Sequence, residues 1–377
     1  MKTRQPSGPS GSPDIRGGGV NARGERLLAL DAIRLLAALA VVWTHFLVMF
    51  EWRVPRFLHR GILDSQGAVM LFFVLSGYVL SLSLRRDRFS VKSYFRFAIR
   101  RVFRLYPLYW VTLLIAFGVL VWIQREGGFV QAPELAVSFL EGEGLQLKQW
   151  ALQSTLVAPG MQIDFANPPV WTLMVEAKIA IVFPFMAWLI LHSRAAVVVA
   201  FLAAVMIGSP WLEERTAGTV VLLAPFGVGA VLARIPEVFW SRFNRLTWWL
   251  FMVGGIALYS SVSLRNALPS KWLVYHACTF GSAALVACGV FWKGFKSPLE
   301  RMQRFLRLDV SYGLYILHFP VLLAMRKLWM VGMIPLPPIW IFSSSLVLLL
   351  CIAAGLHVLI EMPAIRMGRH LTSGDRA

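Results

Sequence analysis

The chain has 377 residues, of which 58% are hydrophobic and only 15% charged, and its formal net charge is +18. About a quarter of the residues in a soluble domain are charged, so this composition excludes an ordinary soluble globular protein. The basic residues are divided among short segments between long apolar runs, which also excludes a continuous nucleic-acid-binding face and predicts an all-α, polytopic membrane protein.

The first 26 residues are rich in Gly, Ser, Pro and Arg, and this composition predicts a disordered, basic cytoplasmic tail. The apolar run that follows is too long for the core of a signal peptide and lacks an evident cleavage site, so we expect it to remain as a membrane span. We predict one transmembrane domain over residues 27–366 and a second short cytoplasmic tail over residues 367–377.

Ten apolar runs are candidates for membrane spans, since a span needs about 20 mostly apolar residues. Several contain proline, which neighbouring helices in a bundle can accommodate. The sequence therefore predicts a bundle of about ten helices, over residues 28–50, 67–84, 105–124, 170–191, 195–212, 218–234, 246–263, 272–292, 310–331 and 339–360.

The distribution of basic residues predicts the orientation of these spans. With the N-terminus inside, the predicted cytoplasmic segments contain 25 lysines and arginines, and the external segments contain 10. Cytoplasmic loops carry an excess of Lys and Arg, so both termini are expected in the cytoplasm of a multi-pass protein of the inner membrane. The longest external connection, residues 125–169, could fold over an outward-facing site.

Three cysteines, Cys278, Cys288 and Cys351, lie in apolar stretches. None has the CxxC spacing of a zinc or redox site, so we interpret them as small side chains buried in the membrane. We expect no disulfide and no metal site.

The first span, "DAIRLLAALAVVWTHFLVMF", contains three polar residues on one helical stripe, Asp31, Arg34 and His45. Arg34 and His45 are separated by ~16 Å along the helix axis, so the stripe connects the two sides of the membrane. Ionisable residues inside a bilayer are costly and often functional. The alternative is structural, with Arg34 extended to the inner headgroups and His45 hydrogen-bonded to a neighbouring helix.

The fourth span contains Glu176, at a depth from the outer surface similar to that of His45. Lys178 is too near in sequence to share the face of Glu176, whereas His45 is a plausible partner. A carboxylate bonded to one ring nitrogen would fix the tautomer and make the other nitrogen a better base. A structural Glu176–Lys178 or Glu176–backbone contact is the alternative.

Residues 85–104, "RRDRFSVKSYFRFAIRRVFR", form a strongly basic cytoplasmic segment. As a helix, it places Arg96, Arg100 and Arg104 on one stripe with Arg101 beside them, opposite an apolar face. Such residues commonly set topology and attract anionic lipids. They also suit a multiply phosphorylated cytosolic ligand, because guanidinium groups bind phosphate oxygens bidentately.

The ninth span begins with "DVSYGLYILHFP", in which Ser311, Tyr315 and His318 share one helical face. These side chains could line the same cavity near the middle of the membrane. Structural hydrogen bonding between helices explains such a group equally well.

Taken together, the chain resembles the acyltransferase 3 family of integral-membrane O-acyltransferases. Six stretches from residue 30 to residue 366 match this family in order, and they are individually weak but jointly specific: "LDAIRLLAALAVVWTH", "GAVMLFFVLSGYVLS", "RFAIRRVFRLYPLYW", "VWTLMVEAKIAIVFP", "SYGLYILHFPVLL" and "IEMPAIR". The resemblance implies a bundle of about ten helices that moves an acyl group, usually acetyl, from cytoplasmic acyl-coenzyme A to a hydroxyl of an extracytoplasmic or lipid-linked glycan.

The resemblance also implies roles for particular residues. The family's Arg-x10-His motif matches Arg34 and His45, with the histidine catalytic, and its Arg-x2-Arg motif, implicated with the coenzyme, matches Arg101 and Arg104. The family's glutamate after the Trp matches Glu176. Leu35 replaces a glycine that family members often have, and the hydrolase-like domain that some members carry is not present in the chain.

We therefore expect His45 and Glu176 to be catalytic, with His45 acting as a general base or as a transient acyl carrier. The expected donor is acyl-coenzyme A, and the expected acceptor is a glycan or a lipid-linked sugar. Membrane lipids are expected to surround the protein, and no permanently bound cofactor is expected. The alternative function is that of a glycolipid or polysaccharide transporter or flippase. The acceptor, the acyl chain and the oligomeric state are left open. The expected acyl-coenzyme A-binding residues are Arg34, Arg100, Arg101, Arg104 and Tyr106, and the expected cavity-lining residues are Asp31, Ser76, Tyr78, Trp171, Ser311, Tyr315 and His318.

Overall fold

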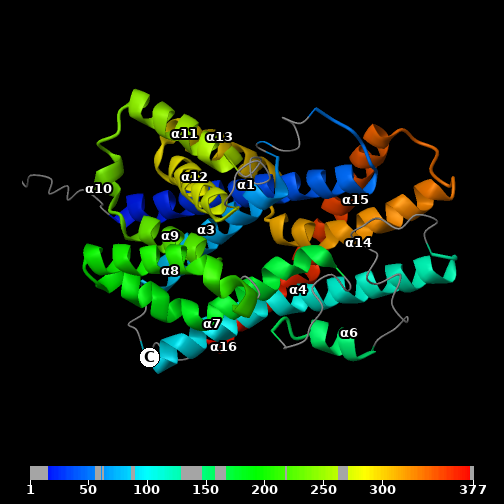
Figure 1. Cartoon of the computed structure of the whole chain (residues 1–377), viewed down its shortest axis with the longest axis horizontal. Helices are drawn as coiled ribbons and strands as arrows, with labels where there is room; N and C mark the ends of the chain where they lie inside the picture. Colours follow the sequence, from blue (N-terminus) through cyan, green and yellow to red (C-terminus); the bar gives the residue numbers. More distant parts are fainter. Residues whose placement is uncertain are drawn as a thin grey trace, which may run out of the picture.

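The computed structural model describes residues 16–55, 61, 63–85, 90–128, 147–157, 167–216, 219–261 and 271–373, and within these it describes only the backbone at 16–27, 147, 209–216 and 271. All regular secondary structure in these segments is helical (Figure 1). The helices are α1 (Arg16–Met49), α3 (Ser65–Leu84), α4 (Val91–Arg125), α6 (Leu147–Gln153), η2 (Pro168–Val170), α7 (Trp171–His192), α8 (Ala195–Thr216), α9 (Leu223–Arg234), α10 (Glu237–Trp240), α11 (Arg245–Ser260), α12 (Lys271–Phe291), α13 (Lys293–Leu306), α14 (Ser311–Met330), α15 (Pro338–Leu356), η4 (His357–Glu361) and α16 (Met362–Leu371).

Each of the ten predicted apolar runs coincides largely with one of these helices. Within the described segments, six helices are long and apolar enough to cross a membrane, or seven if α13 and α14 form one span broken by a bend of 68°. The apolar part of α8, Ala195–Gly208, and helix α9 are shorter. The chain is thus a multi-pass membrane protein, while ten spans and cytoplasmic termini remain predictions.

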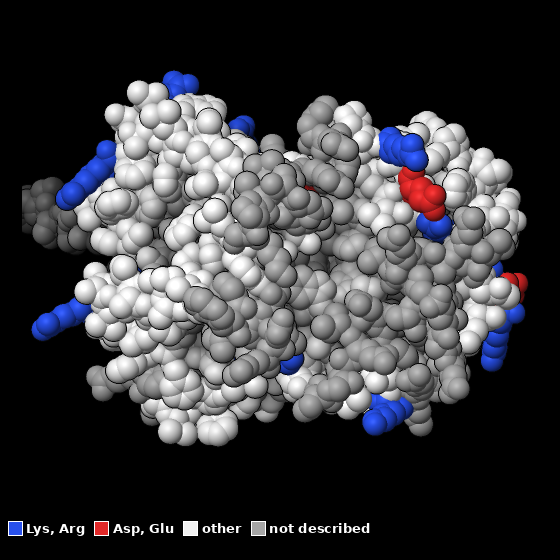
Figure 2. Space-filling view, in the orientation of Figure 1, with Lys and Arg blue, Asp and Glu red and all other residues white. Residues whose placement is uncertain are grey.

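The outer surface of the bundle is apolar. Leu114 on α4, Val199 on α8 and Leu250 on α11 are each at least 65% exposed. On the face that Figure 2 shows, most of the coloured Lys, Arg, Asp and Glu side chains lie toward the two ends of the long axis, and the described surface between them is mostly white. Exposed apolar bands with charged ends are the pattern that a lipid environment favours.

Helices α3 and α9 cross with their backbones in close contact, at one glycine on each helix. A Cβ atom at Gly77 would lie 2.1 Å from the carbonyl oxygen of Phe226, and one at Gly229 would lie 2.1 Å from the carbonyl oxygen of Val74. Small residues let backbones approach closely where lipid offers no hydrophobic drive for association. This crossing holds α3 against the green helices in Figure 1.

Helix α1 lies in the middle of the bundle and packs against α3, α12, α13 and α14. In Figure 1, α1, α4 and α14 run in the same direction, so their C-terminal ends lie on one side of the molecule. The chain bends between α13 and α14, where Arg307 has a φ of 60°. This bend places Asp309 at the head of α14, facing α4.

The basic segment and the C-terminal helices are continuous with spans. Helix α4 begins at Val91 with a capping box from Ser90 and continues unbroken to Arg125. The π-helical turn η4 separates α15 from α16 directly before Pro363, which has no N–H to donate to the preceding turn. Helix α16 then packs along α4.

The predicted tails differ in part from the structure. Helix α1 begins at Arg16, so residues 16–26 are helical rather than disordered; no proline follows Pro13 in this stretch, and a helix extends readily from an existing one. Residues 1–15 and 374–377 lie outside the described part, as does most of the connection over residues 125–169.

Candidate active site

A cavity among α1, α3, α4, α7 and the start of α14 is lined by several polar and charged side chains. It has about 110 Å³ of space for water-sized molecules, and its apolar walls include Val69, Phe72 and Leu173. The polar side chains that line it are Arg34, Ser76, Arg101, Arg104, Thr172, Glu176, Ser311, Tyr312 and Tyr315. A narrow space with apolar walls and three guanidinium groups suits a thin ligand that carries negative charge at one end.

Each of the three arginines that line the cavity is paired with at least one carboxylate. Arg34 Nη1 lies 3.1 Å from Asp31 Oδ1 on the preceding turn of α1. Arg101 on α4 forms a short ion pair with Glu176 on α7, and Ser76 donates a hydrogen bond of 3.3 Å to the same carboxylate oxygen. The carboxylates hold these cations in place, because charged groups inside a membrane need partners.

Arg104 is the most strongly held of the three. It forms ion pairs with Glu361 of η4 and, at 3.4 Å, with Asp309 at the head of α14. Its guanidinium carbon lies 5.5 Å from the ring centroid of Tyr312, a cation–π distance. The other oxygen of the fully buried Glu361 lies 2.9 Å from His357 Nδ1, so the π-helical turn and α14 are both tied to α4.

Arg101 retains a free donor. Its Nε is buried and has no hydrogen-bond partner among the described residues, although its Nη2 contacts Glu176. A buried unpaired donor is costly, and a guanidinium carries five N–H groups in a fixed fork. The arrangement therefore leaves capacity for an anionic or carbonyl ligand at this side chain.

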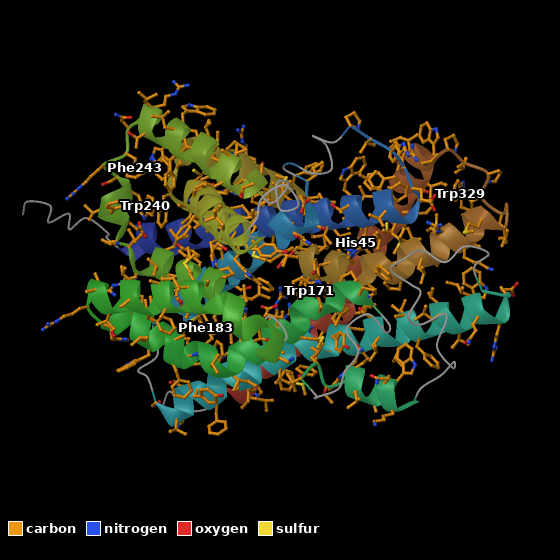
Figure 3. All side chains as sticks on the ribbon, in the orientation of Figure 1. His45, Trp171, Phe183, Trp240, Phe243 and Trp329 are labelled. Atoms are coloured by element: carbon orange, nitrogen blue, oxygen red, sulfur yellow. The ribbon has the colours of Figure 1, made fainter. Side chains whose placement is uncertain are left out.

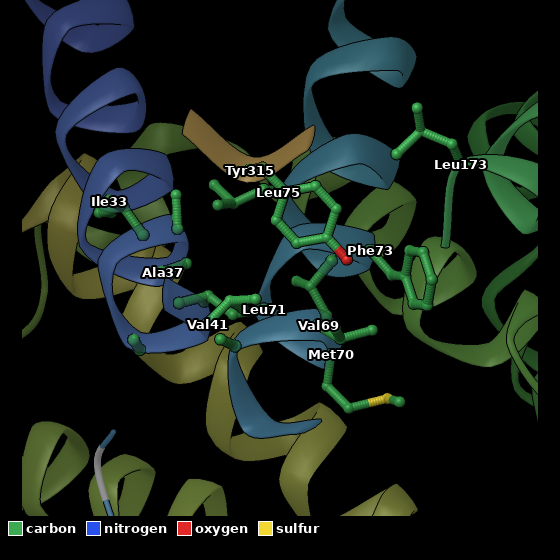
Figure 4. Packing of buried hydrophobic residues seen from close by; sticks show 14 of the residues in the cluster. Ile33, Ala37, Val41, Val69, Met70, Leu71, Phe73, Leu75, Leu173 and Tyr315 are labelled. Carbon is green, nitrogen blue, oxygen red and sulfur yellow. The ribbon is translucent and has the colours of Figure 1, made fainter. Parts of the chain in front are cut away.

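A compact hydrogen-bond group closes the cavity at Tyr315. The Tyr315 hydroxyl lies 2.8 Å from Thr172 Oγ1 and 3.1 Å from the carbonyl oxygen of Pro169. In the close-up of Figure 4, the ring lies among apolar side chains of α3 and its hydroxyl is on the side of Phe73. The ring of Tyr315 is also 5.9 Å from that of His318, so one residue separates the cavity from a histidine pair.

His45 lies between α1 and α14, near the middle of the molecule (Figure 3). Its Nδ1 is 3.0 Å from the carbonyl oxygen of Val41 and 3.1 Å from Nε2 of His318. The ring of Phe319 packs edge-on at 6.1 Å and restricts its rotation. A carbonyl oxygen can only accept, so the Nδ1 of His45 carries a proton and its Nε2 has a lone pair available.

The predicted contact between His45 and Glu176 is wrong. Within the described chain, Glu176 bonds to Arg101 and Ser76, while His45 bonds to Val41 and His318. Helix α7 packs against α4, which carries Arg101, whereas α1 packs against α14, which carries His318, although α3 is a neighbour of both. The Arg101 guanidinium, moreover, is a stronger partner for a carboxylate than a neutral imidazole. The alternative Glu176–Lys178 contact is not formed either.

Several other predicted site residues lie away from the cavity. Arg100 donates to Thr372 Oγ1 at 2.8 Å on α16, and the Tyr106 hydroxyl donates to the carbonyl oxygen of Thr155 at 2.6 Å. Tyr78 is fully buried and Trp171 lies at the start of α7, with neither among the lining residues. Tyr78 and Tyr106 face packed neighbours instead of the cavity. Helical spacing predicts which residues share a face of a helix, but it does not predict which neighbouring helix packs against that face.

Ser76, Ser311 and Tyr315 do lie at the cavity, and Asp31 reaches it only through Arg34. His318 is fully buried behind Tyr315, against His45. Three partners of Arg104 were not predicted from the sequence: Asp309, Tyr312 and Glu361. An acidic residue at the end of a long apolar run was a usable signal for Glu361.

The cysteines are free: Cys278 and Cys288 are buried on α12, and Cys351 is exposed on α15. In the part of the chain that the structure describes, no cluster of three or more His, Cys, Asp or Glu side chains could hold a metal ion. The groups available for chemistry around the cavity are therefore the arginines, hydroxyls, carboxylates and histidines described above.

The amino-acid sequence of the chain is similar to those of known proteins. Over 170 residues the chain is 34% identical to acyltransferase MdmB of Streptomyces mycarofaciens, covering 42% of this chain and 38% of that protein, which is less than half of its length. It is 26% identical to Nodulation protein 10 of Rhizobium leguminosarum bv. viciae, over 91% of this chain and 94% of that protein. No solved structure matches the chain at a comparable level.

The family model described as "Acyltransferase domain", that of the acyltransferase 3 family, matches residues 27–358. This range begins just before the polar stripe of α1 and ends within η4, so it contains the histidine pair and nearly all of the cavity. The chain belongs to the acyltransferase 3 family of membrane acyltransferases.

Proposed function

We propose that the protein transfers an acyl group, acetyl in the simplest case, from acyl-coenzyme A to a hydroxyl group of an extracytoplasmic or lipid-linked glycan. The observation that carries this proposal is the adjacency of two features. A narrow cavity bordered by three arginines ends at Tyr315, and behind Tyr315 lies His318. Nε2 of His318 contacts Nδ1 of His45, which leaves the lone pair of His45 Nε2 free.

The cavity supports an acyl-coenzyme A donor. The coenzyme combines phosphate groups with a thin, uncharged arm that ends in the thioester. Arg34 and Arg101 would hold phosphates or the arm's carbonyl groups at the end of the cavity near the start of α4, with the Nε of Arg101 available for a new hydrogen bond. The apolar walls formed by Val69, Phe72 and Leu173 would contact the arm.

The orientation predicted from basic residues supports a cytosolic donor. Arg101 and Arg104 lie in the N-terminal half of α4, and Arg34 lies near the middle of α1, N-terminal to His45. The excess of Lys and Arg assigns the N-terminal ends of both helices to the cytoplasm. His45 lies further along α1 toward the opposite side. In this orientation, a cytosolic donor and an acceptor from the other face of the inner membrane would meet near the histidine.

The chemistry assigns the proton to His45 Nε2. In direct transfer, the acceptor oxygen bonds to the thioester carbonyl carbon as Nε2 takes its proton, and the C–S bond then breaks to release coenzyme A, whose thiolate takes the proton back. In the two-step route, Nε2 bonds to the acyl carbon as the thiolate leaves, and the acceptor oxygen then displaces the imidazole while the hydroxyl proton passes to the thiolate. Both routes need an unprotonated Nε2.

The experiment compares surface glycans and lipid extracts from cells with the gene, without it, and with a His45→Ala variant. We expect a component heavier by one acyl group only with the intact gene, and NMR of the purified glycan identifies the acylated position. Identical glycans in all three strains, with the protein present in the membrane, would contradict an acyltransferase acting on a glycan.

A further inference from the structure

His318 on α14 forms a hydrogen-bonded pair with His45 and does not line the cavity. We propose that His318 is a positioning residue, which fixes the ring tautomer and orientation of His45 so that Nε2 is always the free nitrogen. This proposal rests on the proposed function, because it assigns to His318 a role in the reaction that His45 performs.

The proton positions in the pair follow from three contacts. His318 Nδ1 lies 2.5 Å from the carbonyl oxygen of Tyr315, and since that oxygen can only accept, Nδ1 carries the proton. The Nε2 of neutral His318 is then an acceptor, and it lies 3.1 Å from His45 Nδ1. His45 Nδ1–H is thus shared between His318 Nε2 and the carbonyl oxygen of Val41.

The other tautomer of His45 is excluded by these acceptors. If the proton of His45 moved to Nε2, the lone pair of Nδ1 would face the Val41 oxygen and the lone pair of His318 Nε2 at the same time. His318 cannot adjust by reversing its own tautomer, because its Nδ1–H is held by Tyr315. Three acceptors, the Val41 oxygen, His318 Nε2 and His45 Nδ1, would then face one another in a buried site. Both hydrogen bonds of His45 Nδ1 would be lost, and no new one would form.

Burial and packing make the pair rigid. His318 is fully buried, the two ring centroids are 4.9 Å apart, and the Phe319 ring packs edge-on against His45 at 6.1 Å. Helices α1 and α14 pack along each other, so both rings are mounted on rigid elements. A group held by a second ring in this way can meet a reacting atom without a loss of orientation.

The pair differs from the His–carboxylate arrangement of hydrolytic triads, in which a buried carboxylate holds the ring through its Nδ1–H. A neutral imidazole acceptor provides the same selection of tautomer without placing a charge at this depth. When Nε2 of His45 gains the acceptor's proton, the bond from Nδ1–H to His318 becomes charge-assisted and strengthens. His318 would therefore stabilise the protonated state that forms during transfer.

Three variants at this position separate the role in tautomer selection from packing. In His318→Gln the side-chain oxygen reaches the place of Nε2 and keeps the acceptor; in His318→Asn the amide reaches only as far as Nδ1; His318→Phe keeps the ring shape without any acceptor. We expect kcat to fall about 10–100-fold in the Asn and Phe variants, with donor KM unchanged, and His318→Gln to retain most of the activity.

A spectroscopic readout on the purified protein completes the test. With ¹⁵N-labelled histidine, we expect His45 of the wild type and of His318→Gln to show a protonated Nδ1, and His318→Phe to show a mixture of both tautomers. A wild-type His45 protonated at Nε2 would overturn the proposal even if no variant folded. Equal kcat in all three folded variants would overturn it as well.

Failure of this inference can be distinguished from failure of the proposed function. If His45→Ala abolishes acyl transfer and His318→Phe leaves kcat unchanged, His45 acts without its neighbour. If His45→Ala remains fully active, the assignment of the proton to His45 is wrong, and the ¹⁵N spectrum still decides which tautomer the pair holds.

Discussion

Two adjacent regions of this bundle handle charge in opposite ways. Around the cavity, Arg34, Arg101 and Arg104 are each neutralised by carboxylates, so the region is densely ionic. A few side chains away, His45 and His318 satisfy each other and two backbone carbonyls as neutral rings. Under the proposed function, the ionic region would hold a charged ligand and the neutral region would move a proton.

The largest expected effect is on the neutral region. His45→Ala removes the only proposed base, and we expect kcat to fall by ~10³-fold, within the range for loss of general acid–base catalysis. The rate of acyl transfer by purified protein measures it. His192→Ala is the matched control, because His192 is exposed at the end of α7, where its Nδ1 lies 3.0 Å from the carbonyl oxygen of Trp188 and its ring stacks on the Trp188 ring. This control should keep full activity.

Substitutions in the ionic region should lower the free energy of unfolding more than they lower the rate of acyl transfer. Arg104→Ala leaves Glu361 buried without its cation, and breaking such a pair costs about 3–5 kcal/mol. Unfolding of the purified protein in detergent should show this loss. Arg104→Met combined with Glu361→Gln should recover much of it, and a stable Arg104→Ala protein would contradict the structural role of this ion pair.

A smaller effect separates two neighbouring arginines of α4. Arg101→Gln should raise the donor KM about tenfold, because a charge-assisted hydrogen bond contributes about 1.5–3 kcal/mol, with little change in kcat. Arg100→Gln is the control on the same helix, since Arg100 contacts Thr372 and does not line the cavity. Equal changes in both variants would point to general electrostatic attraction.

The smallest effect concerns Tyr106. Tyr106→Phe removes one hydrogen bond to the carbonyl oxygen of Thr155, and the free energy of unfolding should fall by about 1 kcal/mol with donor KM unchanged. Tyr109→Phe is the control, because it loses the equivalent hydrogen bond to the carbonyl oxygen of Gln153. A donor KM that rises in Tyr106→Phe but not in Tyr109→Phe would show that Tyr106 contacts the donor.

Hydropathy predicted where the helices lie, because a long apolar run in a membrane protein has few alternatives to a helix. It did not predict the bend at Arg307 or the π-helical turn before Pro363, which depend on local backbone geometry. The apolar pattern also could not separate spans from the shorter helices α8 and α9.

The sequence predicted part of the polar lining of the cavity, but not how those side chains are paired. Depth along each helix suggested that Glu176 would meet His45, yet lateral position is set by helix packing, and Arg101 on α4 lies nearer to the carboxylate. His318 is 273 residues from His45, and a shared cavity was all that its spacing could suggest. Partners from distant helices emerge only when the bundle is assembled.

The most direct measurement uses purified wild-type protein in lipid vesicles with labelled acetyl-coenzyme A and a membrane extract that contains the acceptor. We predict that release of free coenzyme A thiol matches the label appearing in the acceptor, and that both require His45. Movement of the acceptor across the vesicle membrane with no consumption of acetyl-coenzyme A would contradict acyl transfer and would identify a transporter.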